Sequence, residues 1–149
     1  MLTKPTRFTE VYANGLAGQI AQASVELDLT STDSEAIVIS KDSFDAGVGG
    51  DVVIPVAIYA YVTEAVAADD TAPVITVQDT AGNSTGATLT FTDGDAIGDF
   101  AKAEVADGAA LTAVNLTTED MVVAVTTAAA DAATAAGKAK VFVQYLLVK

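Results

Sequence analysis

The stretch that decides the fold runs from Val52 to Thr63 and reads VVIPVAIYAYVT. β-Branched and aromatic residues dominate it, and these residue types favour strands. Because side chains of a strand point alternately to its two faces, each face is expected to carry every second residue. One predicted face holds Val52, Ile54, Val56, Ile58, Ala60 and Val62, and the other holds Pro55, Ala57, Tyr59, Tyr61 and Thr63. Pro55 has no N–H to donate, which predicts an edge position or a β-bulge early in the strand.

Strand signals of the same kind recur along most of the chain. Further strands are predicted at residues 22–29, 36–40, 72–78, 86–92, 111–117, 121–126 and 138–149. The loop at 79–85 is rich in turn-forming residues, so the strands beside it are expected to form a hairpin. The alanine-rich residues 128–136 are expected to be a loop or a hairpin connection. About eight short strands, separated by turn signals, predict an all-β fold that is β-sandwich or jelly-roll-like.

The last predicted strand, residues 138–149, is apolar on both faces. Val141, Val143, Tyr145 and Leu147 alternate with Phe142, Gln144, Leu146 and Val148. A strand with two apolar faces is typical of a position that is covered on both sides. It is therefore expected to be central in its sheet, or covered on its outer face by a partner.

One segment, Asp95 to Val105, has the spacing of a short helix. Ile97, Phe100, Ala101 and Val105 fall on one helical face, with Asp93 or Asp95 as a cap and Gly108 as a stop. The region also resembles a calcium-binding EF-hand loop, because Asp93, Asp95, Gly98 and Glu104 have suitable residue types. Ile97 stands where that loop needs a ligating side chain. We therefore expect no metal and no other cofactor, while calcium at Asp93, Asp95 and Glu104 stays open.

The predicted domain organisation is an N-terminal arm, residues 1–20, followed by a single β-sandwich domain, residues 21–149. The arm carries Lys4 and Arg7, two of the seven basic residues, together with Phe8 and Tyr12. Two interpretations are open: a frayed terminus, or an arm that lies along an acidic or apolar neighbour. The arm has no apolar run of the kind found in secretory signals, so none is expected.

Charge and missing residue types narrow the function. The 149 residues include 20 acidic and seven basic side chains, a formal net charge of −13, which disfavours binding to nucleic acid or to a membrane surface. The absence of His and Cys removes imidazole bases, thiol nucleophiles and the metal sites built from them. Carboxylate pairs such as Asp69–Asp70 leave a hydrolase as a minor hypothesis. The chain is predicted not to be an enzyme.

Two segments resemble parts of tailed-bacteriophage virion proteins. They are Tyr12-Ala-Asn-Gly-Leu16 and Thr134-Ala-Ala-Gly-Lys-Ala-Lys-Val-Phe-Val-Gln-Tyr145. The second, Ala-Gly-Lys followed by a Val-x-Val-x-Tyr strand, is similar to segments of many small phage head and tail proteins. The acidic, cysteine-free composition, rich in Ala and Thr, is similar to that of marine-phage proteins. Within that class the chain most resembles a capsid decoration, or cement, protein.

The resemblance implies a homo-oligomer, with a trimer favoured, that is made in the host cytoplasm and sits on the capsid exterior. There it is expected to bind the major capsid protein across neighbouring subunits and stabilise the shell by burial, an arm or loop pairing with a neighbour's sheet edge. A phage tail or head-fibre adhesion or carbohydrate-binding module is the alternative, and the oligomer number and head or tail location stay open.

Basic and aromatic residues are the candidates for the partner interface. They are Lys4, Arg7, Phe8, Tyr12, Tyr59, Tyr61, Phe142 and Tyr145. Amphipathic aromatics on an outer sheet face are typical of contact surfaces. Tyr59 and Tyr61 are equally compatible with the edge of the monomer core.

Overall fold

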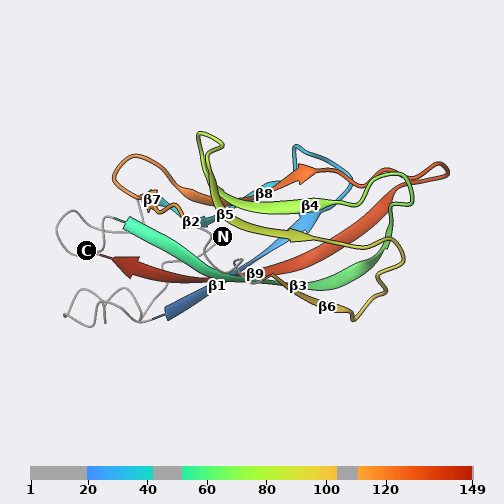
Figure 1. Ribbon diagram of the computed structural model, residues 1–149, viewed down its shortest axis with the longest axis horizontal. Helices are drawn as coiled ribbons and strands as arrows, with labels where there is room; N and C mark the ends of the chain where they lie inside the picture. The colour runs from blue at the N-terminus through green and yellow to red at the C-terminus, as the bar shows by residue number, and fades with distance from the viewer. Residues whose placement is uncertain (1–19, 42–51, 104–110, 149) are drawn as a thin grey trace.

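The computed structural model describes residues 20–41, 52–103 and 111–148. These residues form nine β-strands in two antiparallel sheets, which confirms the predicted all-β class. The strands are β1 (Ile20–Asp28), β2 (Glu35–Ile39), β3 (Val52–Ala67), β4 (Val74–Asp79), β5 (Ser84–Thr90), β6 (Phe100–Ala103), β7 (Val114–Asn115), β8 (Met121–Thr127) and β9 (Ala136–Val148). Figure 1 shows the sheets as two facing layers.

The two sheets enclose one apolar core. The five-stranded sheet has the order β1-β9-β3-β6, with β7 paired to β3, and the four-stranded sheet has the order β2-β8-β4-β5. The largest fully buried side chains come from both layers: Tyr145, Phe91, Leu27, Leu29, Ile39, Ile58, Ile75, Met121 and Leu147. The core therefore sits between the layers, and each sheet keeps an outer face.

The last strand, β9, is central, as its two apolar faces predicted. It pairs antiparallel with β1 on one side and with β3 on the other. Residues from Ala139 to Leu147 alternate strictly between buried and half-buried or exposed positions. The buried set, with Val143 in its middle, faces the core, and the other set lies on the outer face of the five-stranded sheet.

A β-bulge at Pro55 changes the predicted faces of β3. The pairing of β3 with β9 shifts register between Pro55 and Ala57. One extra residue at a bulge moves every following side chain to the other face. Val53 before the bulge and Ile58 after it are both buried, so the prediction that Val52 and Ile54 share the face of Ile58 was wrong. The predicted bulge itself is confirmed. β3 as a whole lies between β9 and β6, but among the described strands none pairs with Pro55 on the side opposite β9.

The predicted short helix is wrong for the part of Asp95–Val105 that the structure describes. Residues 92–99 form two successive four-residue turns with the same pattern, Thr92-Asp-Gly-Asp95 and Ala96-Ile-Gly-Asp99. In each turn the last backbone N–H donates to the first carbonyl, and the last carboxylate accepts the first N–H at 2.8 Å. β6 then follows as a strand.

Glycine and the neighbouring strand explain why turns replace the helix. Gly94 and Gly98 have φ values of 84° and 98°, which a right-handed helix cannot contain. Their N–H groups donate to the carbonyls of Val66 and Val62 on β3, both at 3.0 Å. The turns therefore lie along β3, and the side chains assigned to a buried helical face are exposed: Ile97 by 67% and Phe100 by 64%.

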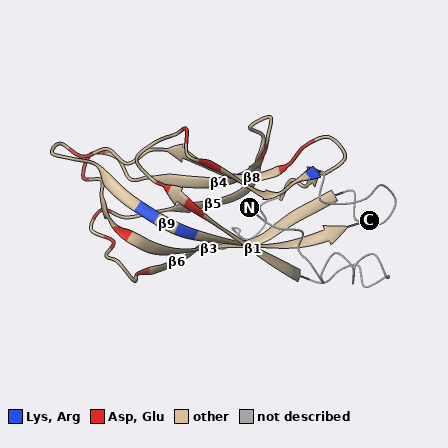
Figure 2. Cartoon of the chain, turned by 180° about the vertical axis from the view of Figure 1, so that it is seen from behind, with Lys and Arg blue, Asp and Glu red and all other residues tan. Residues whose placement is uncertain are grey.

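The four-stranded sheet agrees more closely with the predictions from the sequence. β4 and β5 form the expected antiparallel hairpin, and residues 128–135 are the expected connection, held by a bridge between Thr71 and Ala130. The strand predicted at 111–117 shrinks to the two residues of β7. Acidic residues lie mostly in the loops, as Figure 2 shows in red, while Lys138 and Lys140 stand on β9.

Thr85 provides the hydrogen-bond donor for the buried carbonyl of Val77 in the β4–β5 hairpin. The register shifts between Thr76 and Gln78, and at this point the Thr85 hydroxyl, in a residue 1% exposed, donates to the Val77 carbonyl at 2.7 Å. We expect Thr85→Val to lower the free energy of unfolding by about 1–2 kcal/mol, because a buried acceptor loses its donor. Thr88→Val, at an exposed position of the same strand, changes it by less than about 0.5 kcal/mol. Equal effects in urea unfolding would contradict this role.

Asp79 gives the hairpin a pH dependence. Its carboxylate accepts the side-chain N–H and the backbone N–H of Asn83, both at 2.8 Å, and the side-chain hydrogen bond is the main cause that lowers the pKa of Asp79 below its ordinary 3.8. A lowered pKa in the folded state means that the stabilisation is present above pH 3.8 and is lost as the pH falls through the folded value.

We therefore expect Asp79→Ala to destabilise the protein at neutral pH by at most about 1 kcal/mol, since the group is largely exposed. The difference from the parent protein disappears at about pH 2 in urea titrations. Asp70→Ala removes a carboxylate for which no side-chain hydrogen bond is found in the described part of the chain, and it serves as the control. A pH-independent effect of Asp79→Ala would contradict the prediction.

Candidate interaction surface

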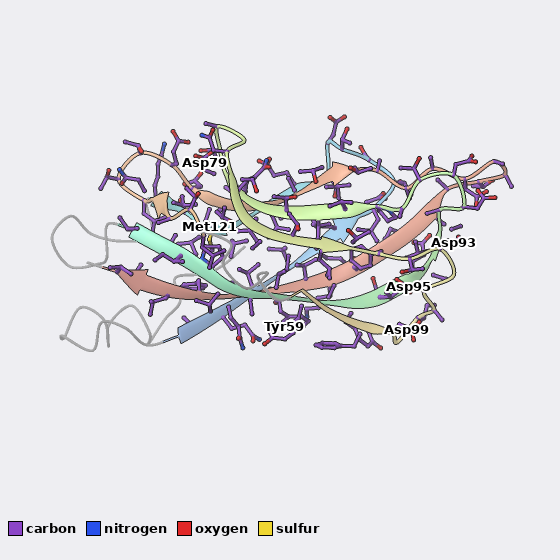
Figure 3. All side chains as sticks on the ribbon, in the orientation of Figure 1. Tyr59, Asp79, Asp93, Asp95, Asp99 and Met121 are labelled. Carbon is purple, nitrogen blue, oxygen red and sulfur yellow. The ribbon has the colours of Figure 1, made fainter. Side chains whose placement is uncertain are left out.

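The outer face of the five-stranded sheet gathers four aromatic side chains, which we call the aromatic face: Tyr59, Tyr61, Phe100 and Phe142. Strand pairing explains the cluster. Phe142 on β9 lies opposite Tyr59 on β3, and Tyr61 lies opposite Phe100 on β6. Rings on directly opposed or diagonal positions of neighbouring strands are close enough to contact. Figure 3 shows Tyr59 on the side of the sheet away from the other layer.

The rings of the aromatic face contact one another and a lysine. Tyr59 and Phe100 stack with ring centroids 5.8 Å apart and planes inclined by 30°. The Lys140 ammonium lies 5.8 Å from the centroid of the Phe142 ring, within reach of a cation–π interaction. These contacts hold the rings in place while Phe100 stays mostly exposed.

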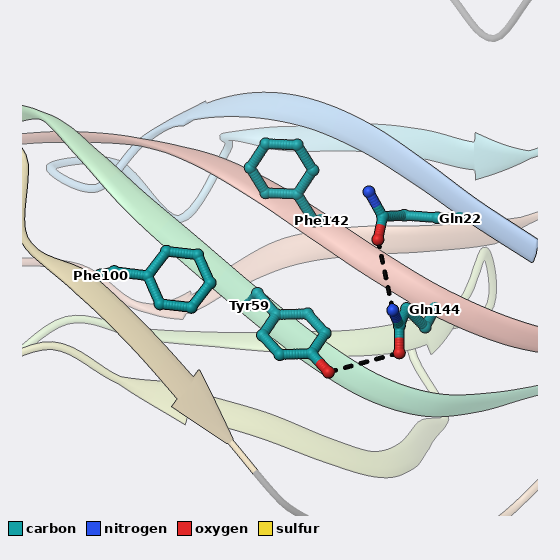
Figure 4. Close-up of a pocket in the computed structure, with 5 residues that line it drawn as sticks. All are labelled: Gln22, Tyr59, Phe100, Phe142 and Gln144. Atoms are coloured by element: carbon teal, nitrogen blue, oxygen red, sulfur yellow. Dashed lines mark hydrogen bonds between the residues drawn. The ribbon is translucent and has the colours of Figure 1, made fainter.

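Two glutamines continue the aromatic face toward β1. The Tyr59 hydroxyl donates to Gln144 Oε1 at 3.3 Å, and Gln144 Nε2 donates to Gln22 Oε1 at 3.4 Å (Figure 4). Gln22 and Gln144 are opposite each other in the pairing of β1 with β9. Together with Tyr59, Phe100 and Phe142 they line an open hollow of about 250 Å³.

Charged residues occupy the far end of the same face. Lys138 Nζ lies 2.8 Å from Glu64 Oε2, and this hydrogen bond is the main cause that raises the pKa of Lys138. The register also sets Asp28 opposite Lys138 and Glu26 opposite Lys140. The basic positions of β9 therefore face acidic neighbours, whereas the lining of the hollow carries no charged side chain.

The predicted interface residues divide into three groups. Tyr59, Tyr61 and Phe142 lie together on the aromatic face. Tyr145 is 1% exposed in the core, so assigning it to the interface was wrong: it alternates with Phe142 and Gln144 and faces inward. The arm residues Lys4, Arg7, Phe8 and Tyr12 lie outside the described residues.

Three residues of this surface were missed in the sequence. The sequence pattern assigns Phe100 to a helical face, and it places Gln22 and Gln144 in strands without predicting a role for either. The signal for Phe100 is the repeated pattern x-x-Gly-Asp that precedes it, because such turns end a loop and start a strand. No local signal pairs Gln22 with Gln144, which are 122 residues apart.

The acidic loop after β5 does not converge on a metal. Asp93 Oδ1 accepts the Ala68 N–H at 2.8 Å, while Asp95 and Asp99 each close their own turn. Within the described residues no group of three or more candidate ligands could hold a metal ion, and Glu104 lies outside them. Figure 3 shows the three aspartates spread along the loop. Asp95 and Asp99 cap turns, and Asp93 ties the loop to the end of β3.

Comparisons with known proteins give no family. No family model matches the chain, and no curated protein matches it. A solved chain from the Bacillus endospore appendages, described as disulfide-linked pili, is 16% identical, with a TM-score of 0.33 over 89% of this chain and 91% of that chain. At that score the likeness carries no argument. In the part of the chain that the structure describes, no helix is long and apolar enough to cross a membrane.

Proposed function

We propose that this protein is a structural virion subunit without enzymatic activity, which decorates a phage capsid and stabilises it by binding across neighbouring capsid subunits. The resemblance of its sequence to capsid decoration proteins supports the proposal, and so does an all-β domain with open strand edges. The proposal includes the jelly-roll-like wrap expected of such domains, a trimeric state, and a position on the capsid exterior.

The observation that carries the proposal is the open edge of β1. This strand is nine residues long and, among the residues that the structure describes, forms one edge of the five-stranded sheet. Asp28 N–H donates to Ser34 Oγ and not to β9, whereas Leu29 N–H donates to the Gly137 carbonyl of β9. In antiparallel pairs the direction of the N–H alternates along the strand. The N–H groups of Ser24 and Glu26 therefore point away from β9.

An open edge of this kind favours strand addition. A strand from a neighbouring subunit gains one main-chain hydrogen bond for each N–H or carbonyl that the edge offers, so it binds with fixed register. Natural proteins usually blunt such edges unless they are used. β1 contacts β2, the edge strand of the other sheet, where Ile37 is 48% exposed. Two edges and an apolar side chain thus lie on one side of the domain.

On a capsid, weak individual contacts at strand edges are sufficient for stable binding. A shell repeats the same partner surface many times, and an oligomer that contacts several copies at once binds more tightly than any single contact. The predicted arm, with Lys4, Arg7, Phe8 and Tyr12, precedes β1 directly in the sequence. Its basic residues complement an acidic partner surface, and its aromatic residues complement an apolar one.

Ser24→Pro tests the edge. Ser24 is exposed, and its N–H points away from β9, so proline removes a donor to a neighbour without removing a bond within the sheet. We expect the variant to keep its fold and to bind capsid shells at least about tenfold more weakly in cosedimentation. Ser24→Ala changes the same side chain, keeps the N–H, and binds like the parent protein.

The outcomes separate the steps of the proposal. If Ser24→Pro unfolds the chain in thermal melts, Glu26→Pro repeats the test at the next outward N–H. Equal binding of shells by the proline and alanine variants would show that the β1 edge is not the contact with the capsid. A parent protein that is monomeric by light scattering and does not sediment with assembled shells would contradict capsid decoration altogether.

A further inference from the structure

The hollow on the aromatic face combines three rings with two amides. Tyr59, Phe100 and Phe142 come from β3, β6 and β9, and Gln22 and Gln144 complete it from β1 and β9 (Figure 4). Rings present flat apolar area, while the phenol and amides supply donors and acceptors. We propose that this hollow is a binding site for a neutral carbohydrate, with a sugar ring against Phe100 and Tyr59 and sugar hydroxyls on the two glutamines.

The exposure and the fixed orientation of the rings fit a stacked ligand. Phe100 is 64% exposed, although an aromatic ring of this size usually gains from burial. Its stack on Tyr59 fixes the orientation of both rings before a ligand arrives, which lowers the entropy lost on binding. One face of a pyranose ring is lined by C–H groups, and these cover the exposed aromatic surface. The ring stack therefore supplies the apolar part of the site.

The polar part of the site is held by weak bonds. The hydrogen bonds from Tyr59 to Gln144 and from Gln144 to Gln22 measure 3.3 and 3.4 Å. Both are longer than strong hydrogen bonds of their types. Exchanging these two hydrogen bonds for bonds to ligand hydroxyls therefore costs little free energy. Each amide offers both a donor and an acceptor, as does a sugar hydroxyl, so the pattern suits a polyhydroxylated ligand better than an aliphatic side chain.

Size and charge define the ligand further. A hollow of about 250 Å³ is smaller than sites for drug-sized ligands and fits a single sugar ring, with further rings extending into solvent. Its lining is uncharged, and the chain as a whole carries a net charge of −13, which repels anionic sugars. The site is therefore assigned to neutral hexose or N-acetylhexosamine units. It goes beyond capsid decoration, and it uses side chains of the sheet face, Gln22 of β1 included, and not the main-chain groups of the β1 edge.

Ligand titration followed by NMR tests the site. The probes are methyl α-glucoside, methyl β-galactoside, methyl α-mannoside and methyl N-acetyl-β-glucosaminide, each titrated into the full chain. We expect at least one of them to shift the resonances of Tyr59, Phe100 and Gln144. Phe100→Ala removes the exposed ring and Gln144→Leu removes the amide at similar volume, and each is expected to weaken binding about tenfold.

Ile37→Ala is the matched control, because it truncates a comparably exposed apolar side chain on the other sheet. It is expected to bind the sugar like the parent protein. The proposal is overturned if none of the four glycosides shifts these resonances, or if both hollow variants bind as well as the control. Resonance shifts that depend on protein concentration without sugar would also overturn it, in favour of contact between copies of the chain. The capsid proposal is tested by shell binding of the Ser24 variants, and the sugar proposal by resonance shifts at the hollow. Either proposal can therefore fail while the other stands.

Discussion

The structure depends on the pairing of β9 with both β1 and β3. This strand lies in the middle of the five-stranded sheet, and its partners come from early and middle parts of the chain. Its alternate residues, from Ala139 to Leu147, are buried without interruption. A slip of one residue would turn that whole set toward solvent, so the register of the sheet is strongly specified. The arrangement of the outer-face side chains of β1, β9 and β3 follows from this register.

The outer face owes its character to two irregularities in otherwise regular pairing. The bulge after Pro55 reverses the faces of β3, so that Tyr59 and Tyr61 face outward beside the half-buried chains of β9. The tandem turns before β6 bring Phe100 to a position opposite Tyr61. Without either irregularity, the rings would not meet. Bulges near sheet edges commonly re-aim side chains in this way.

Much of the fold could be predicted from the sequence, because alternation of apolar residues is a local property. The central position of β9, the β4–β5 hairpin and the bulge at Pro55 are confirmed. The face assignment of Val52 and Ile54 failed since a bulge shifts the phase of alternation, and a pattern of period two does not reveal where that shift occurs. The prediction of a helix was wrong because the spacing of Ile97 and Phe100 also fits two glycine-containing turns. Tertiary pairing with β3 decides between them. The amide contact of the hollow joins residues 122 positions apart, which no local pattern reports.

The order of the strands along the chain has a consequence for synthesis. β1 and β3 leave the ribosome before β9, yet each has β9 as a neighbour. Until β9 emerges, the five-stranded sheet lacks its middle, and both strands carry open edges. The chain between β1 and β9, or between β3 and β9, forms a long loop when these strands pair. Closing such a loop costs more entropy than closing a hairpin, and folding dominated by distant pairings is slow. The domain thus completes its fold only after β9 has emerged, and its nascent chain passes through a period in which chaperones or premature association have access to its strands.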